Sequence, residues 1–165
     1  MSHGRFDNPV VAALAGFWDL FRKQDNAKRL TEKDRFDQKT IIITGANSGL
    51  GFGLSVEIAK RGGHVIMACR SQIPEAGEKV KRLSGSEKVE MRKLDLSNIE
   101  SIYEFCDSLL KDQIKPDVTI LNAAVALPDA RKTESGQEEM FLVNYLSNVM
   151  LTNIMFSKGI INLKN

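Results

Sequence analysis

The stretch TIIITGANSGLGFGLSVEIAKRGG, residues 40–63, decides the fold of this chain. A run of β-branched residues, a glycine cluster and an amphipathic segment predict a strand, a tight loop and a helix in that order. In the loop, Gly45 permits a tight turn, Gly49 lets the backbone approach a pyrophosphate, and Gly51 allows close packing of helix on strand. Free N–H groups at the start of such a helix attract an anion. The alternative is a glycine turn that binds nothing.

Short apolar runs alternate with helical periods from Lys39 onward, which is typical of βαβ units around a parallel sheet. We therefore expect an α/β fold with a doubly wound parallel sheet in residues 39–165. The predicted strands are 40–44, 64–68, 88–93 and 117–121, and the predicted helices are about 50–61, 72–84, 98–112 and 136–157.

The sequence predicts that residues 1–38 are a separate segment, an amphipathic helix followed by a charged connection. Its apolar residues recur at three- and four-residue steps: Val10, Leu14, Phe17, Trp18 and Phe21. The apolar run is too short for a membrane span or a secretory signal. Two interpretations remain: the helix packs on its own protein or subunit, or residues 9–29 lie on a membrane surface.

Composition excludes several classes of function. A formal net charge of +2 argues against a broad nucleic-acid surface. Cys69 and Cys106 have no CxxC partner, which favours reduced thiols and therefore a cytoplasmic protein. Each is better explained as an inert buried thiol than as a reactive nucleophile. His3 and His64 have no neighbours at metal-ligand spacing, so we expect no metal site.

The glycine spacing is GxxxGxG, and three further motifs follow it in order: KLDLSN at 93–98, LNAAV at 121–125 and TESGQEEMFLVNYLSNVMLT at 133–152. In these motifs the chain resembles the short-chain dehydrogenases/reductases from Lys39 to about Thr152. Within that family it is similar to the retinol-dehydrogenase-like and protochlorophyllide-reductase-like subgroup. The resemblance implies a Rossmann-type nucleotide-binding domain and an oxidoreductase that interconverts a small-molecule carbonyl and alcohol. The amphipathic leader would suit a lipophilic substrate.

The end of the second strand, MACRS, bears on the choice of cofactor. An acidic residue at position 69 would favour NAD, whereas Cys69 followed by Arg70 favours the extra phosphate of NADP. A surface arginine in a loop is the alternative. The loop and the resemblance together assign cofactor contacts to Gly45, Asn47, Ser48, Gly49, Leu50, Gly51, Arg70, Asp95, Leu96, Asn122, Ala123 and Ala124.

The catalytic pair implied by the resemblance is absent from this sequence. The family uses a Tyr with a Lys four residues later, helped by a Ser. Tyr103 and Tyr145 are followed at that spacing by Asp107 and Val149. Asn144 is the one residue of this chain that matches a catalytic residue of the family. We interpret Lys132 and Lys158 as solvated surface residues.

We therefore expect a Rossmann sheet that is incomplete on its C-terminal side, and a 165-residue chain that is inactive by itself. Residues 117–121 would form an apolar edge that favours homo-oligomers or aggregation. Apolar side chains of helix 136–157 would lack cover: Met140, Phe141, Met150, Leu151 and Phe156. The alternative function is that of a non-catalytic nucleotide-binding or interaction protein, and a weaker one is scaffolding at a membrane surface.

Overall fold

The computed structural model describes residue 31 and residues 33–162. The chain divides into two units, Met1–Lys33 and Asp34–Asn165, and the sheet and its helices all belong to the second unit. The helix predicted at residues 9–29 lies outside the described residues. Within the described part of the chain, no helix is long and apolar enough to cross a membrane.

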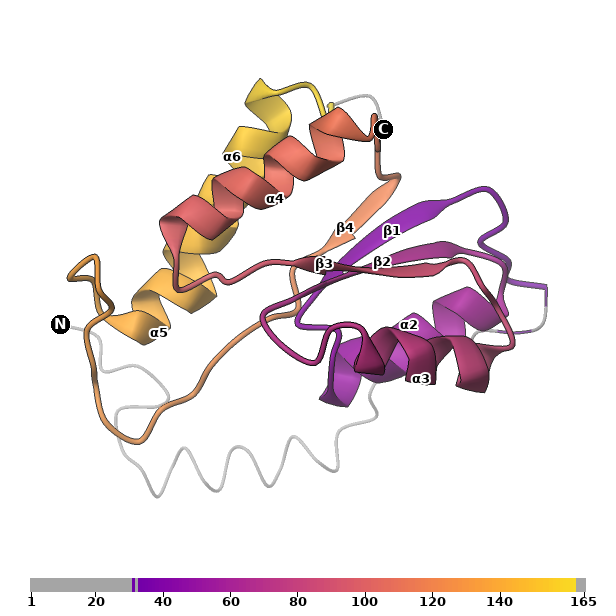
Figure 1. Ribbon diagram of the computed structural model, residues 1–165, viewed down its shortest axis with the longest axis horizontal. Helices are drawn as coiled ribbons and strands as arrows, with labels where there is room; N and C mark the ends of the chain where they lie inside the picture. Colours follow the sequence, from indigo (N-terminus) through magenta and orange to yellow (C-terminus); the bar gives the residue numbers. More distant parts are fainter. Residues whose placement is uncertain (1–30, 32, 163–165) are drawn as a thin grey trace, which may run out of the picture. The chain divides into compact units, whose positions relative to one another are not determined.

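Four parallel strands form the central sheet in the order β3-β2-β1-β4 (Figure 1). Their bounds are Thr40–Thr44 for β1, His64–Cys69 for β2, Val89–Lys93 for β3 and Val118–Ile120 for β4. In the register, Ile42 lies opposite Ile66 on one side and Thr119 on the other. The two central strands are nearly continuous apolar runs because helices cover both faces. The predicted α/β parallel sheet is confirmed.

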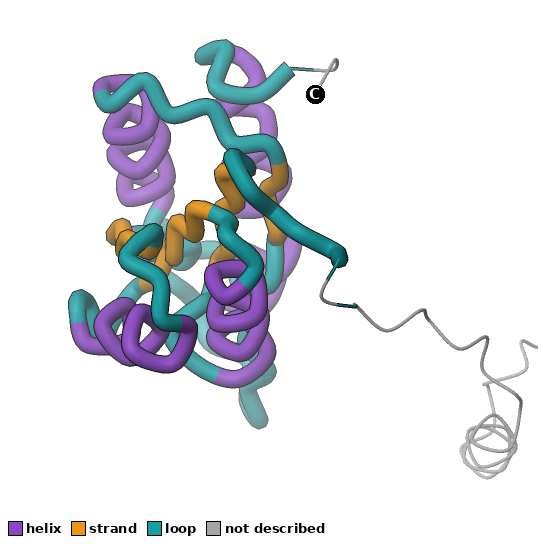
Figure 2. Tube along the Cα trace, turned by 90° about the vertical axis from the view of Figure 1, so that its right-hand side faces the viewer, coloured by secondary structure: helices purple, strands orange, loops and turns teal. Residues whose placement is uncertain are grey.

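Helices cover both faces of the sheet, with α2 (Gly49–Lys60) and α3 (Glu75–Ser84) on one and α4 (Ile99–Lys111) and α6 (Ser147–Ser157) on the other. Figure 2 shows the strands between these two helical layers. Because side chains alternate along a strand, Ile41 and Ile43 join the core cluster with α2 and α3, while Ile42 joins the cluster with α4 and α6.

The helix predicted at about 136–157 begins later, at Glu139, and contains a π-helical turn. A short α5 (Glu139–Phe141) leads into a π-helical turn at Leu142–Leu146 and then into α6. The start is late because Gly136, at φ 84°, belongs to a turn, and the Glu138 carboxylate accepts the N–H groups of Met140 and Phe141 as a cap. A π-helical turn occurs mostly as a single turn inside a longer α-helix, so the helical prediction for this stretch did not reveal it.

β4 is an edge strand of the described sheet and is shorter than predicted. Val118 is 46% exposed and Leu121 is 44% exposed, as expected for an apolar edge. Phe141 and Phe156 are exposed as well, but Leu151 is fully buried. The expectation that Leu151 lacks cover is therefore wrong, because this side chain belongs to the core cluster shared with α4.

Candidate functional site

The glycine loop after β1 packs directly on the chain that follows β4. Gly45 has φ 65° and donates its N–H to the Ala68 carbonyl at 2.9 Å. A Cβ at Gly45 would lie 2.9 Å from Ala123 Cα, and one at Gly51 would lie 2.7 Å from the Gly45 carbonyl oxygen. Both positions are therefore restricted to glycine by close backbone approach.

The loop leaves the start of α2 exposed to solvent. Gly49 has φ 57°, and a Cβ built there would meet nothing within 4 Å. Ser48 is the N-cap but makes no capping hydrogen bond through its side chain, and the first turn contains no acidic residue. The first N–H groups of a helix have no acceptor within it, so this end can receive a phosphate. Leu50 beside it is 87% exposed.

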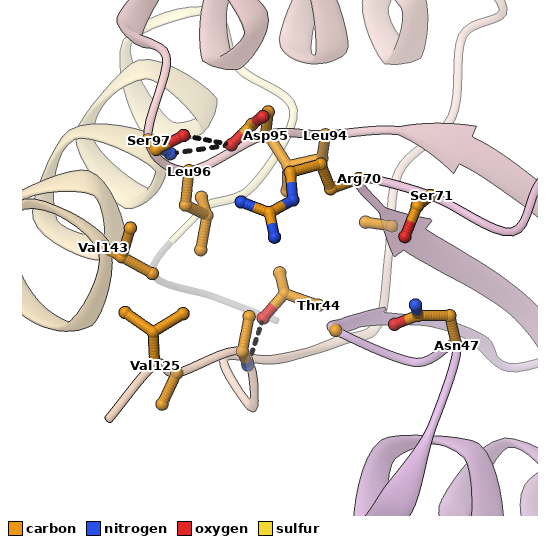
Figure 3. Close-up of a pocket in the computed structure, with 14 residues that line it drawn as sticks. Thr44, Asn47, Arg70, Ser71, Leu94, Asp95, Leu96, Ser97, Val125 and Val143 are labelled. Atoms are coloured by element: carbon orange, nitrogen blue, oxygen red, sulfur yellow. Dashed lines mark hydrogen bonds between the residues drawn. The ribbon is translucent and has the colours of Figure 1, made fainter. Parts of the chain in front are cut away.

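A pocket lies at the carboxyl ends of the strands, where open α/β sheets bind ligands (Figure 3). Predicted site residues that line it are Gly45, Asn47, Arg70, Asp95, Leu96, Ala123 and Ala124. Ser48, Gly49, Leu50 and Gly51 are outside this lining, at the start of α2, and Asn122 lies behind it against Gly45. The structure thus brings segments distant in sequence to one place.

Thr44, which sequence reasoning did not single out, joins the two sides of this pocket. It is fully buried at the end of β1. Its hydroxyl accepts the N–H groups of Asn122 and Ala123, each at 3.0 Å, and its carbonyl accepts Asn122 Nδ2 at 3.0 Å. Thr44 therefore fixes the turn after β4 beside the glycine loop. In the sequence, the one sign of this role is a hydroxyl residue at the end of an apolar strand.

Asp95 is held at the far wall of the pocket by its own neighbours. Its Oδ1 accepts the Ser97 N–H at 2.9 Å and the Ser97 hydroxyl at 2.6 Å, both drawn in Figure 3. Its backbone N–H donates to the Ser101 hydroxyl at 3.0 Å. Leu96, which follows, is buried, and its carbonyl accepts the Ser147 hydroxyl at 2.6 Å. The carboxylate is therefore positioned before any ligand binds.

The tip of β2 carries a positive charge, and neither Cys69 nor Arg70 is acidic. Cys69 is 1% exposed, and burial raises the pKa of its thiol to about 11, so position 69 is neutral near pH 7. Arg70 is exposed, and Figure 3 shows its guanidinium pointing into the pocket between Thr44 and Leu96. Lys93 Nζ donates to the Arg70 carbonyl at 2.7 Å. This wall of the pocket suits a negatively charged ligand group.

Asn144 does not line this pocket, but it holds Val125, which does. Its Oδ1 accepts the Val125 N–H at 2.8 Å, and its Nδ2 donates to the Val125 carbonyl at 2.8 Å. Asn144 also lines a separate hollow with Leu121, Tyr145 and Asn148. In this structure its side chain therefore connects the π-helical turn to the segment that follows β4.

Further lining residues were not predicted: Thr44, Ala68, Ser71, Leu94, Ser97, Val125 and Val143. They come from the ends of β1 and β2, the segments after β2, β3 and β4, and the π-helical turn, and most carry no polar group that a motif could reveal. Lys132 is exposed, as predicted. Lys158 is also at the surface, where it forms an exposed ion pair with Asp107 at 2.6 Å. Cys106 is buried.

The family model described as short chain dehydrogenase matches residues 39–160. Retinol dehydrogenase 13 of Mus musculus is 39% identical over 151 residues, which cover 90% of this chain and 45% of the relative. Retinol dehydrogenase 14 of Homo sapiens is 36% identical over 167 residues, which cover 88% of this chain and 50% of the relative. The chain thus spans about half the length of these curated relatives.

Solved structures show the same fold. The crystal structure of an uncharacterised protein from Mycobacterium paratuberculosis has a TM-score of 0.66 and 36% identity, and covers 79% of this chain and 47% of that chain. A short-chain dehydrogenase from Shigella flexneri 2a str. 301, complexed with NADP, has a TM-score of 0.62 and 20% identity, with 75% and 54% coverage. At that identity the second match establishes the fold alone.

Proposed function

This chain belongs to the short-chain dehydrogenase family, and from that premise we propose that it forms the NADP-binding part of an oxidoreductase that interconverts a carbonyl and an alcohol. The observation that carries the proposal is the open helix start at Gly49 beside a pocket that Arg70 lines. The relatives are named retinol dehydrogenases. A lipophilic alcohol or aldehyde of that kind is therefore the proposed substrate class.

The residues around the pocket fit a dinucleotide. The first turn of α2, with no acidic side chain, would hold the pyrophosphate. Asp95 and Leu96 would bind the adenine side, and Ala123 and Ala124 would line the path that continues from Gly45. When bound, the nicotinamide group would supply or accept hydride. The role of this chain would be to bind and orient that cofactor.

NADP, and not NAD, is the proposed cofactor because of the charge at the tip of β2. Arg70 would pair with the 2′-phosphate, and Cys69 is neutral where an acid would repel it.

Direct titration tests the proposed cofactor. We expect the purified 165-residue chain to bind NADPH at least about tenfold more tightly than NADH, measured by the change in nicotinamide fluorescence. Binding of neither dinucleotide would refute the proposed function. Equal binding of both would refute the NADP preference alone.

We propose that residues 1–165 bind cofactor without turning over substrate. No Tyr in this sequence has a Lys four residues later, so the chain offers no proton donor of the family type. Asn144 keeps a proposed supporting role in catalysis. The expected result is NADPH binding without NADPH oxidation in the presence of retinal. Steady oxidation would contradict it.

A second candidate is a non-catalytic nucleotide-binding or interaction protein. The missing Tyr–Lys pair favours it equally. It requires the 165-residue chain to form a folded monomer or a defined dimer that binds NADP(H). Light scattering combined with the same titration would detect this, and an aggregated or non-binding chain would exclude it.

Contact with a membrane surface is the third proposal, and it concerns residues 9–29. The sequence there has an aromatic and apolar stripe beside Lys23, Lys28 and Arg29, which would make a cytoplasmic protein membrane-peripheral. We expect the chain to co-sediment with anionic liposomes and the double variant Trp18→Glu, Phe21→Glu to remain in the supernatant. Equal sedimentation of both chains would argue against this contact.

The boundary predicted between residues 38 and 39 also stays a prediction.

A further inference from the structure

We propose that Lys93 is a specificity-determining residue that supplies the second positive charge of the 2′-phosphate site. This inference rests on the proposed NADP-binding function. The sequence motif drew attention to Arg70 alone, since Lys93 lies on a different strand, 23 positions later in the chain. The sheet is what brings the two residues together.

The position of Lys93 follows from the strand register. Lys93 is the last residue of β3 and lies opposite Cys69, the last residue of β2. The next residue, Leu94, donates its N–H to the Cys69 carbonyl at 2.9 Å, which keeps the strand ends aligned. Lys93 thus stands at the carboxyl end of the sheet, the end at which ligands bind in this type of fold.

A hydrogen bond holds the Lys93 ammonium group against the backbone of Arg70. Lys93 Nζ donates to the Arg70 carbonyl at 2.7 Å. An ammonium group has three donors, so this bond leaves two for a ligand. The side chain is exposed and can therefore adjust to an incoming phosphate without unpacking the core.

Lys93 lines a hollow with Glu104 of α4 and takes part in no ion pair found among the described residues. On β3, which lies wholly within the described residues, the basic side chain that forms ion pairs is Arg92, and its partners are Glu90 and Asp112. Cys69 opposite Lys93 is neutral near pH 7. The carboxylate of Asp95, two residues after Lys93, accepts hydrogen bonds from Ser97.

The charge of the ligand explains why two cations are useful. A phosphate monoester carries about −1.5 to −2 charges near pH 7. Arg70 alone would leave part of that charge uncompensated, whereas Arg70 and Lys93 together match it. NADH has a hydroxyl at this position, so the contribution of Lys93 should appear with NADPH and be absent with NADH.

The test compares the NADPH and NADH affinities of charge variants of the full 165-residue chain. Lys93→Gln should weaken NADPH binding about fivefold and change NADH binding less than about twofold. Lys93→Arg should restore NADPH affinity. The defect should shrink as salt is raised from low to high concentration, because the interaction is between exposed charges.

Lys88→Gln is the matched control, since Lys88 is exposed just before the amino end of the same strand. It should leave both affinities unchanged. The inference is overturned if Lys93→Gln binds NADPH as tightly as the wild type, or if it weakens NADPH and NADH equally, as a purely structural role would. If the wild-type chain binds neither dinucleotide, the proposed function itself fails.

Discussion

At the scale of single residues, Gly49 combines a positive φ with open space where a phosphate would lie. Gly49→Ala places a methyl group in that space and should cost about 1 kcal/mol of stability through backbone strain. We expect NADPH affinity to fall at least about tenfold, measured by fluorescence titration.

The control for this loop variant is Gly53→Ala in the same helix. A Cβ at Gly53 also meets nothing within 4 Å, and Gly53 has no positive φ. Alanine there should stabilise α2 by about 0.5–1 kcal/mol and leave NADPH binding unchanged. Similar affinity losses in both variants would mean that Gly49 has no special role.

Thr44 presents a second test at this scale. Thr44→Val keeps the shape but removes the buried acceptor for the N–H groups of Asn122 and Ala123. The free energy of unfolding should fall by about 1–3 kcal/mol in urea denaturation. Thr152→Val, on the exposed side of α6, should change it by less than about 0.5 kcal/mol. A stable Thr44→Val chain would show that the 122–123 turn does not depend on this hydroxyl.

At the scale of elements, Asn144 joins the π-helical turn to the segment after β4 through two hydrogen bonds to Val125. Asn144→Ala should lower the free energy of unfolding by about 1–2 kcal/mol. NADPH affinity should fall a few-fold as well, because Val125 and Ala124 line the pocket. Urea denaturation and fluorescence titration measure the two effects.

Asn153→Ala is the matched control for Asn144→Ala because Asn153 is exposed in the middle of α6. Alanine should be neutral or slightly stabilising there, owing to its higher helix propensity. Unchanged stability of Asn144→Ala would contradict the clamp that the structure shows. In that case, the proposed supporting role in catalysis would be the remaining explanation for an asparagine at position 144.

At the scale of the whole molecule, we expect the apolar edge at β4 to promote association of the chain in solution. Val118 and Leu121 are exposed on an edge strand, which favours association. We expect concentration-dependent association of the chain in sedimentation velocity, and Val118→Lys should reduce it. Leu110→Lys, at an equally exposed residue near the end of α4, should not. A wild-type chain that stays monomeric at high concentration would contradict this prediction.

The family membership and the fold were both predictable because they depend on short-range patterns. Residues 40–63 contain the strand, the loop and the helix start in one segment, and the family match to residues 39–160 confirms the resemblance. Asp95, Ala123 and Arg70 were found because each follows a strand in a recognisable motif, and all line the same pocket. Their roles in binding stay predictions.

The order of strands and helices, the glycine loop and the lack of a Tyr–Lys pair can all be found in the amino-acid sequence alone. These features depend on local backbone preference and on residue identity alone. Only the tertiary structure decided that Thr44 holds the turn after β4, that Asn144 clamps Val125 and that Lys93 lies against Arg70. The physical reason is that strand pairing and helix packing bring these groups together across long stretches of chain, and no pattern along the sequence specifies those distances.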